Sequence, residues 1–187
     1  ERFLYYCDKE GYLVWGEYGN WGLDHTRPDA VYSVLPEWLT EIERDFNHPA
    51  IIGWCPFNET WNINDRKQFD PLLALVYDAT KAADITRPCI DTSGNFHVKT
   101  DIFDLHDYEQ NVDVFKKNND IIIETGIPYD RFSAIQEYKK GLPVFISEYG
   151  GIKWSPVDGN SRDVSWGYGD APKSEDEFKA RYKGLTD

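Results

Sequence analysis

Two glutamates stand where apolar runs of this sequence end, and a carboxylate in that position can do chemistry. Glu59 follows the run "AIIGWCPFN", and Glu148 lies in "PVFISEYG". Strand interiors avoid charge, so each glutamate is either an ordinary solvated strand end or a positioned catalytic group. Most enzymes that hydrolyse a glycosidic bond use a pair of carboxyl groups, which act as acid and nucleophile in the retaining enzymes.

The spacing between the two glutamates supports the catalytic interpretation. Glu148 follows Glu59 by 89 residues. An eight-stranded βα barrel of about 250 residues uses roughly 31 residues for each βα unit, so the two strands would lie about three units apart. Such strands nearly face each other across a barrel, with both carboxylates at its C-terminal mouth. A retaining glycosidase needs its two carboxyl groups about 5–5.5 Å apart.

The elements that must position these glutamates alternate between helices and strands. Apolar spacing and capping residues predict helices that end at Gly11, span 35–47, span 70–84 with Asp70 as its cap, span about 129–140, and follow the capping pair Ser174 and Glu177. Apolar runs predict strands at 12–17, 50–57, 88–93, 101–108 and 143–150. Residues 121–124 fit either a strand or a helical turn, and 151–173 read as a long loop. This alternation indicates a parallel α/β fold.

Two stretches of the sequence carry a family resemblance. "FNHPAIIGWCPFNET" and "PVFISEYGG" resemble the two catalytic signatures of glycoside hydrolase family 2, which includes β-galactosidases, β-glucuronidases and β-mannosidases. "ERFLYYCDKEGYLVWGE" is similar to the helix and strand that precede the first signature, so the likeness covers almost the whole chain. The resemblance implies that Glu59, after barrel strand 4, is the acid/base, and that Glu148, on strand 7, is the nucleophile.

The resemblance also suggests residues that bind substrate. Asn58 would hydrogen-bond the sugar 2-hydroxyl, and Tyr108 resembles the family's tyrosine that hydrogen-bonds the nucleophile. His106 either lines the pocket or is a satisfied buried histidine. Trp61 and Trp154 are either platforms for a sugar ring or parts of a loop core.

The resemblance covers only part of a barrel. It runs from the helix before strand 3 to the helix after strand 7, so strands 1, 2 and 8 and the family's β-sandwich domains are missing from it. We therefore expect residues 1–187 to be a single incomplete barrel domain, a partial (β/α)8 TIM barrel of the α/β class. Its partners would be the remaining strands and sandwich domains, and it would show little activity alone. A signal peptide would lie outside this segment, so localisation stays open.

The expected function is a retaining exo-β-glycosidase, most similar to a β-galactosidase and acting on a neutral sugar. One alternative is a retaining β-glycanase of the same barrel type, similar to a mannanase or cellulase. Another is a non-catalytic carbohydrate-binding module. Seven Trp, twelve Tyr and ten Phe suit sugar binding but also simply fill cores.

Composition excludes several other classes of function. A net charge of −13 argues against nucleic acid or an anionic membrane as partner. No apolar run is long enough to insert into a membrane, and no glycine-rich phosphate loop follows a strand. We expect no cofactor, and no His and carboxylate spacing predicts a metal site. Glu17 is expected at most to support the site indirectly, and the scattered Cys7, Cys55 and Cys89 to be buried free thiols.

Overall fold

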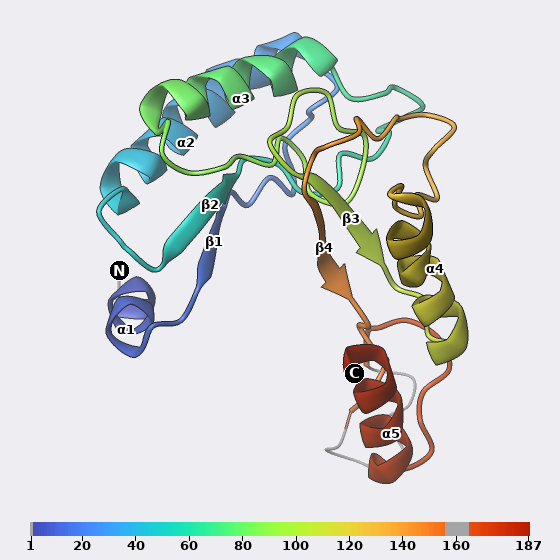
Figure 1. Ribbon diagram of the computed structural model, residues 1–187. Helices are drawn as coiled ribbons and strands as arrows, with labels where there is room; N and C mark the ends of the chain where they lie inside the picture. The colour runs from blue at the N-terminus through green and yellow to red at the C-terminus, as the bar shows by residue number, and fades with distance from the viewer. Residues whose placement is uncertain (1, 156–164) are drawn as a thin grey trace.

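The strands form two parallel pairs in the computed structural model, which describes residues 2–155 and 165–187. In one pair, β1 (Val14–Glu17) lies beside β2 (Ile51–Cys55), and in the other, β3 (Phe103–Asp107) lies beside β4 (Val144–Tyr149). Figure 1 shows β1 and β2 running toward the middle of the molecule and β3 and β4 running away from it. The sheet does not close in the described part of the chain, so the fold is a partial barrel, as the sequence predicts.

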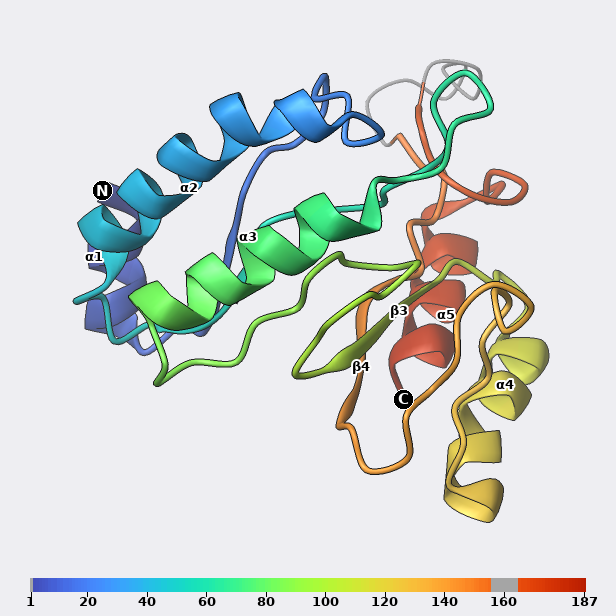
Figure 2. The same cartoon turned by 90° about the horizontal axis from the view of Figure 1, so that it is seen from above.

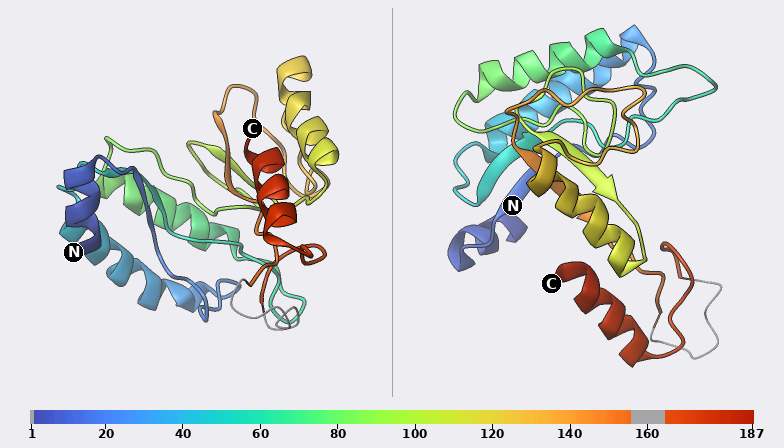
Figure 3. Two further views of the ribbon diagram at one scale, coloured as in Figure 1. Left: turned by 90° about the horizontal axis from the view of Figure 1, so that it is seen from below. Right: turned by 45° about the vertical axis from the view of Figure 1, so that its right-hand side comes forward.

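Helices cover the outside of each strand pair. The helices are α1 (Arg2–Glu10), the short 3-10 helix η1 (Pro28–Ala30), α2 (Val31–Asp45), α3 (Asp70–Ala83), α4 (Val112–Thr125) and α5 (Glu175–Thr186). Helices α1, α2 and α3 lie on the side of the first pair, and α4 and α5 lie on the side of the second (Figure 2). Figure 3 shows the same separation from below, with α4 and α5 neighbouring each other. In the described ranges no helix has the length and apolar character needed to cross a membrane.

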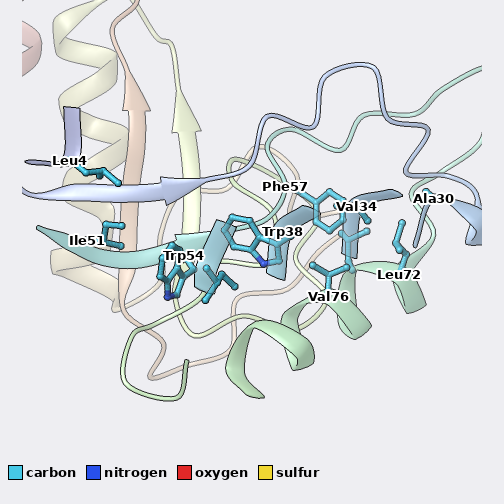
Figure 4. Close-up of a cluster of buried hydrophobic side chains, with 11 residues drawn as sticks. Leu4, Ala30, Val34, Trp38, Ile51, Trp54, Phe57, Leu72 and Val76 are labelled. Atoms are coloured by element: carbon cyan, nitrogen blue, oxygen red, sulfur yellow. The ribbon is translucent and has the colours of Figure 1, made fainter. Parts of the chain in front are cut away.

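The main hydrophobic core lies between α2, α3 and β2 (Figure 4). Trp38 and Trp54 are fully buried at its centre and meet edge to face with ring centroids 5.8 Å apart. Each indole N–H has a partner, because Trp38 donates to Thr80 Oγ1 at 2.7 Å and Trp54 donates to Asp84 Oδ2 at 2.8 Å. This core holds β2 rigidly and so fixes where the chain emerges at its C-terminal end.

Residues 88–93 do not form the continuous strand that the sequence predicts. They lie parallel to β2 through two isolated bridges, Trp54 with Cys89 and Asn58 with Ser93. On its other side Cys89 binds a loop, because its amide donates to Asp101 Oδ2, whereas Ser93 reaches β3 through the side chain of Asp104. Asp91 likewise accepts hydrogen bonds from the backbone of residues 98–99. The predicted neighbour of β2 is therefore present, but its ladder is interrupted by side-chain bonds.

The predicted helix over 129–140 is wrong. Residues 131–135 form a turn, in which Asp130 Oδ1 accepts from the Phe132 amide at 2.7 Å. The helix of this region is α4, which lies earlier in the chain and includes the ambiguous residues 121–124. Its limits were readable from local signals, since Asn111 caps its first turn and Gly126 ends it with φ of 71°.

Other boundaries differ by a few residues. Helix α2 begins at Val31, before the predicted start at residue 35. Asp70 is the first residue of α3, not its cap, which is Phe69. The predicted capping pair is confirmed, because Ser174 Oγ accepts from the Glu177 amide at 3.2 Å. The three cysteines are buried free thiols, as expected.

Candidate active site

The two glutamates singled out by the sequence share one site. Glu148 lies on β4, and Glu59 follows the bridge that continues β2 beyond its end. His106 of β3 lies between them, with Nδ1 2.8 Å from Glu59 Oε1 and Nε2 3.5 Å from Glu148 Oε1. One donor atom from each of the three residues lies within 4.8 Å of the other two. The register of the sheet explains this arrangement in part, because His106 is the direct Cα partner of Glu148.

The backbone holds Glu59 in an uncommon conformation. Its φ is 46°, in the left-handed region that a residue with a side chain rarely adopts, and such a conformation costs on the order of 1–3 kcal/mol. The surrounding bonds stabilise it, since the Glu59 amide donates to the Ser93 carbonyl at 2.9 Å. The residue before Glu59, Asn58, is held by two hydrogen bonds to the side chain of Asn20. Asn20 Oδ1 accepts from the Asn58 amide at 2.8 Å, and Asn20 Nδ2 donates to the Asn58 carbonyl at 3.1 Å. Sequence reasoning missed Asn20.

The side chain of Asn58 has unused hydrogen-bonding capacity. The residue is 9% exposed, and its Oδ1 forms no hydrogen bond with any residue that the structure describes. A buried amide oxygen without a partner is costly unless a ligand or water satisfies it. The position next to Glu59 therefore fits a residue that binds substrate.

A buried polar network fixes His106 from behind. Asp104 Oδ2 accepts from Ser93 Oγ at 2.5 Å and from Ser147 Oγ at 2.9 Å, and Ser93 Oγ lies 2.9 Å from His106 Nε2. Burial raises the pKa of the Asp104 carboxyl, although the hydrogen bonds of the two serines oppose that rise. Gly94 makes room for the imidazole, because a Cβ at this position would lie 2.4 Å from His106 Nδ1. The sequence carried no signal for this network.

Tyr108 contacts Glu148 as the sequence analysis anticipated. Its hydroxyl donates to Glu148 Oε2 in a very short hydrogen bond. Its ring stacks on Tyr168, with centroids 3.9 Å apart and planes 13° from parallel. Burial, followed by the bond to Glu148 and its charge, raises the pKa of Tyr108 well above its ordinary value. The phenol therefore stays a hydrogen-bond donor across the physiological pH range.

The charges of the site act on one another. The hydrogen bond from His106 lowers the pKa of Glu59, and this exceeds the opposing effect of burial. The direction is opposite to the raised pKa usually arranged for a proton donor. Glu17, at the end of β1, has its pKa raised by desolvation and then by the charge of Glu148. Glu17 is therefore close enough to the centre to contribute to its negative field.

The two tryptophan candidates lie in different surroundings. Trp61 is 36% exposed, and its Nε1 donates to Glu59 Oε2 at 3.1 Å. Its ring meets Phe96 and Phe132 at centroid distances of 5.7 and 5.4 Å. Trp154 instead stacks on Phe178 of α5 at 5.7 Å. Much of the predicted loop around Trp154, residues 156–164, lies outside the described residues.

Glu59, His106 and Glu148 are also the group in the described part of the chain that could together hold a metal ion. Two carboxylates and an imidazole are suitable ligands for a divalent transition metal. The three residues come from separate strand ends, so their spacing along the chain could not reveal the cluster.

The comparison with protein families identifies the chain. The model for the TIM barrel domain of glycosyl hydrolases family 2 matches residues 3–159. This chain belongs to glycosyl hydrolase family 2. The two strand pairs and helices α2, α3 and α4 lie within the matched range, as do Glu59, Glu148 and Tyr108. Comparison with curated proteins gave no significant match.

Solved structures of family 2 enzymes share this fold at low sequence identity. A β-glucuronidase from an uncultured Clostridium sp. matches with TM-score 0.60 and 16% identity over 98% of this chain. A β-glucuronidase from Ruminococcus gnavus, in complex with an N1-substituted uronic isofagomine, matches with TM-score 0.61 and 21% identity over 98%. A putative β-galactosidase from Bacteroides fragilis matches with TM-score 0.51 and 18% identity over 92%. The chain covers 32%, 31% and 24% of these three proteins, respectively.

Proposed function

We propose that this chain carries the two catalytic carboxyl groups of a retaining exo-β-glycosidase similar to a β-galactosidase. The observation that carries the proposal is the shared site of Glu59 and Glu148, with a carboxylate oxygen of each within 4.8 Å of the other. So short an oxygen–oxygen distance supports the 5–5.5 Å carboxyl separation of retaining enzymes over the 6.5–9.5 Å of inverting ones, which must fit a water between the carboxyl groups.

In the proposed first step, an oxygen of Glu148 attacks the anomeric carbon while the bond from that carbon to the leaving oxygen breaks. Glu59 gives its proton to the leaving oxygen. Tyr108 holds the attacking carboxylate in place, and Asn58 Oδ1 accepts from the sugar 2-hydroxyl, an interaction that strengthens in the transition state.

In the proposed second step, Glu59 takes a proton from water as the water oxygen attacks the anomeric carbon. The bond to Glu148 breaks and the carboxylate returns. Glycosylation has removed the charge of Glu148 by then, so Glu59 ionises without repulsion and acts as the base.

The substrate class that we propose is a neutral terminal sugar. Glu17, Glu59 and Glu148 give the site a negative field, and the charge of Glu148 adds to burial in raising the pKa of Glu17. A uronate at the same position would add a further negative charge. A panel of nitrophenyl β-glycosides tests this proposal in the intact protein that contains these residues. We expect a galactoside, or another neutral glycoside, to be hydrolysed at least about tenfold faster than the glucuronide; a preference for the glucuronide would contradict the proposal.

Azide rescue tests the two roles. Glu59→Ala should still be glycosylated by a dinitrophenyl glycoside, whose leaving group barely needs an acid, and azide should speed release of a β-configured product. Glu148→Ala should lose both steps and give an α-configured azide product. The reverse pattern of configurations would exchange the two assignments. Sugar binding by the intact protein without any hydrolysis would instead favour a binding module.

We further propose that residues 1–187 are one incomplete domain with little activity alone. The described strands form two separate two-stranded sheets, and segment 88–93 pairs through isolated bridges with Trp54 and Asn58. Robust turnover of a nitrophenyl glycoside by these residues in isolation would contradict this proposal.

A further inference from the structure

A cavity of about 430 Å³ lies beside the aromatic residues that neighbour Glu59. It opens between the loop before α3, the loop after residue 95, and the turn around residue 135. Its wall consists of Asn62, Lys67, Gln68, Asp70, Phe96, His97, Val98, Ile135 and Gln136. The volume falls within the range of small-molecule sites, about 300–1,000 Å³. The mechanism proposed above makes no use of this cavity.

Two residues of the cavity wall contact the acid/base side of the catalytic site. Phe96 is part of its wall, and the same ring contacts Trp61, which donates to Glu59. Gln68 makes a second connection, because its Oε1 accepts a very short hydrogen bond from the hydroxyl of Thr60. The cavity wall therefore contacts Thr60 and Trp61, the two residues that follow Glu59.

The position relative to Glu59 decides which part of a substrate reaches the cavity. Glu59 gives its proton to the leaving oxygen, so the leaving group must lie on the Glu59 side of the carboxylate pair. Tyr108 and Tyr168 lie on the Glu148 side. A leaving group on the Glu59 side would therefore lie against Trp61 and its aromatic neighbours, and the cavity lies beyond them.

The wall has the chemistry of a carbohydrate site. It combines the aromatic ring of Phe96 with amide side chains that can both donate and accept hydrogen bonds. Gln136 is 8% exposed; its Oε1 accepts from the His97 amide at 2.9 Å, while its Nε2 lacks a hydrogen-bond partner among the described residues. Lys67 forms no ion pair within residues 2–155 and 165–187. Phe96 has φ of 49°, an uncommon conformation of the kind that clusters at ligand sites.

We propose that this cavity is a subsite for the second sugar unit on the leaving-group side, so that the substrate is a β-linked oligosaccharide of at least three units. The inference rests on the proposed function, since the order of the subsites follows from Glu59 being the acid. Asn62 and Lys67 are the residues to change, because both side chains are exposed on the cavity wall and take no part in the catalytic site.

The test compares substrates that differ by one unit. We take the β-linked disaccharide that the intact protein cleaves best and the trisaccharide that extends it by one unit at the reducing end. In the natural protein, kcat/KM should be about tenfold higher for the trisaccharide, the gain expected from one or two added hydrogen bonds. The double variant Asn62→Ala, Lys67→Ala should bring that ratio to about one and leave kcat/KM for the nitrophenyl glycoside unchanged. Lys140→Ala, a lysine outside the cavity, should keep the full ratio.

Two outcomes overturn the inference, and a third result separates it from the proposed function. A ratio near one in the natural protein, or a ratio that survives the double variant, shows that the cavity binds no second unit. Calorimetric binding of the same two sugars to Glu148→Gln makes the comparison without turnover, so it stands even if hydrolysis fails. Absence of hydrolysis of every nitrophenyl glycoside by the natural protein contradicts the proposed function instead.

Discussion

Replacing Tyr108 with phenylalanine should slow the second chemical step more than the first. The Tyr108 hydroxyl donates to Glu148 Oε2, and phenylalanine removes this one hydrogen bond while keeping the ring that stacks on Tyr168. Glu148 loses its negative charge during glycosylation and regains it during deglycosylation. A donor that stabilises the carboxylate therefore assists its departure from the sugar, and its removal raises the barrier of the second step.

The size of the effect follows from the type of hydrogen bond. A bond to a charged group contributes about 1.5–3 kcal/mol. If about half of the charge has returned to Glu148 in the second transition state, the loss is about 0.75–1.5 kcal/mol, which slows deglycosylation roughly four- to twelvefold. The rate of glycosylation should change less, because loss of the Tyr108 hydrogen bond also makes the attacking Glu148 carboxylate more basic.

Rapid mixing with a dinitrophenyl β-glycoside measures the two steps separately. Tyr108→Phe should release a burst of dinitrophenolate equal to the enzyme concentration, followed by a steady rate below that of the natural protein. Tyr168→Phe is the matched control, because it removes the same group from the stacked ring, whose hydroxyl has no hydrogen bond in the described ranges. A lower steady rate with no burst would refute the reasoning, because glycosylation would then be the step that Tyr108 assists.

Three further predictions concern the surroundings of the site. His106→Phe removes the hydrogen bond that lowers the pKa of Glu59, so this pKa should rise; since Glu59 must be protonated to act as the acid, the alkaline limb of the kcat/KM–pH profile should move to higher pH, and an unmoved limb would contradict the role of His106. Gly94→Ala places a Cβ 2.4 Å from His106 Nδ1 at a residue with φ of 85°, so kcat/KM should fall by about tenfold or more while circular dichroism stays native; full activity would show that the close approach is unimportant. Asp84→Asn weakens a buried carboxylate that accepts from Trp54 Nε1 at 2.8 Å and from Arg87 at 2.7 Å, and should destabilise the intact protein by about 3 kcal/mol in denaturant unfolding. Despite burial, the hydrogen bonds of Asp84 lower its pKa on folding. The stability that the Asp84 carboxylate contributes is therefore present above its unfolded pKa of about 3.9 and is lost as the pH falls below that value. The natural protein should lose more stability on acidification than the variant, and equal losses would contradict this.

Local signals in the sequence were enough to predict most of the elements and to single out the central pair of glutamates. Glu59 and Glu148 were identifiable because each ends an apolar run, and because parallel strands place their C-terminal ends at one edge of a sheet. The capping residues of α5 and the glycine that ends α1 act over a few positions, so they too could be read along the chain. The misplaced helix over 129–140 shows the limit of this reasoning, since Asp130 ties the backbone into a turn that competes with helix.

The tertiary structure alone decided how the pair is held. His106 reaches both glutamates only because of its register opposite Glu148 and because Gly94 leaves space for its ring. Ser93 and Asn20 act on residues 13 and 38 positions away, respectively. The parallel fold itself follows from patterns that repeat at the period of a helix or a strand. The long-range contacts of His106, Ser93 and Asn20 depend instead on which strands become neighbours and at what offset. Packing of the whole core determines that arrangement, so no short stretch of sequence records it.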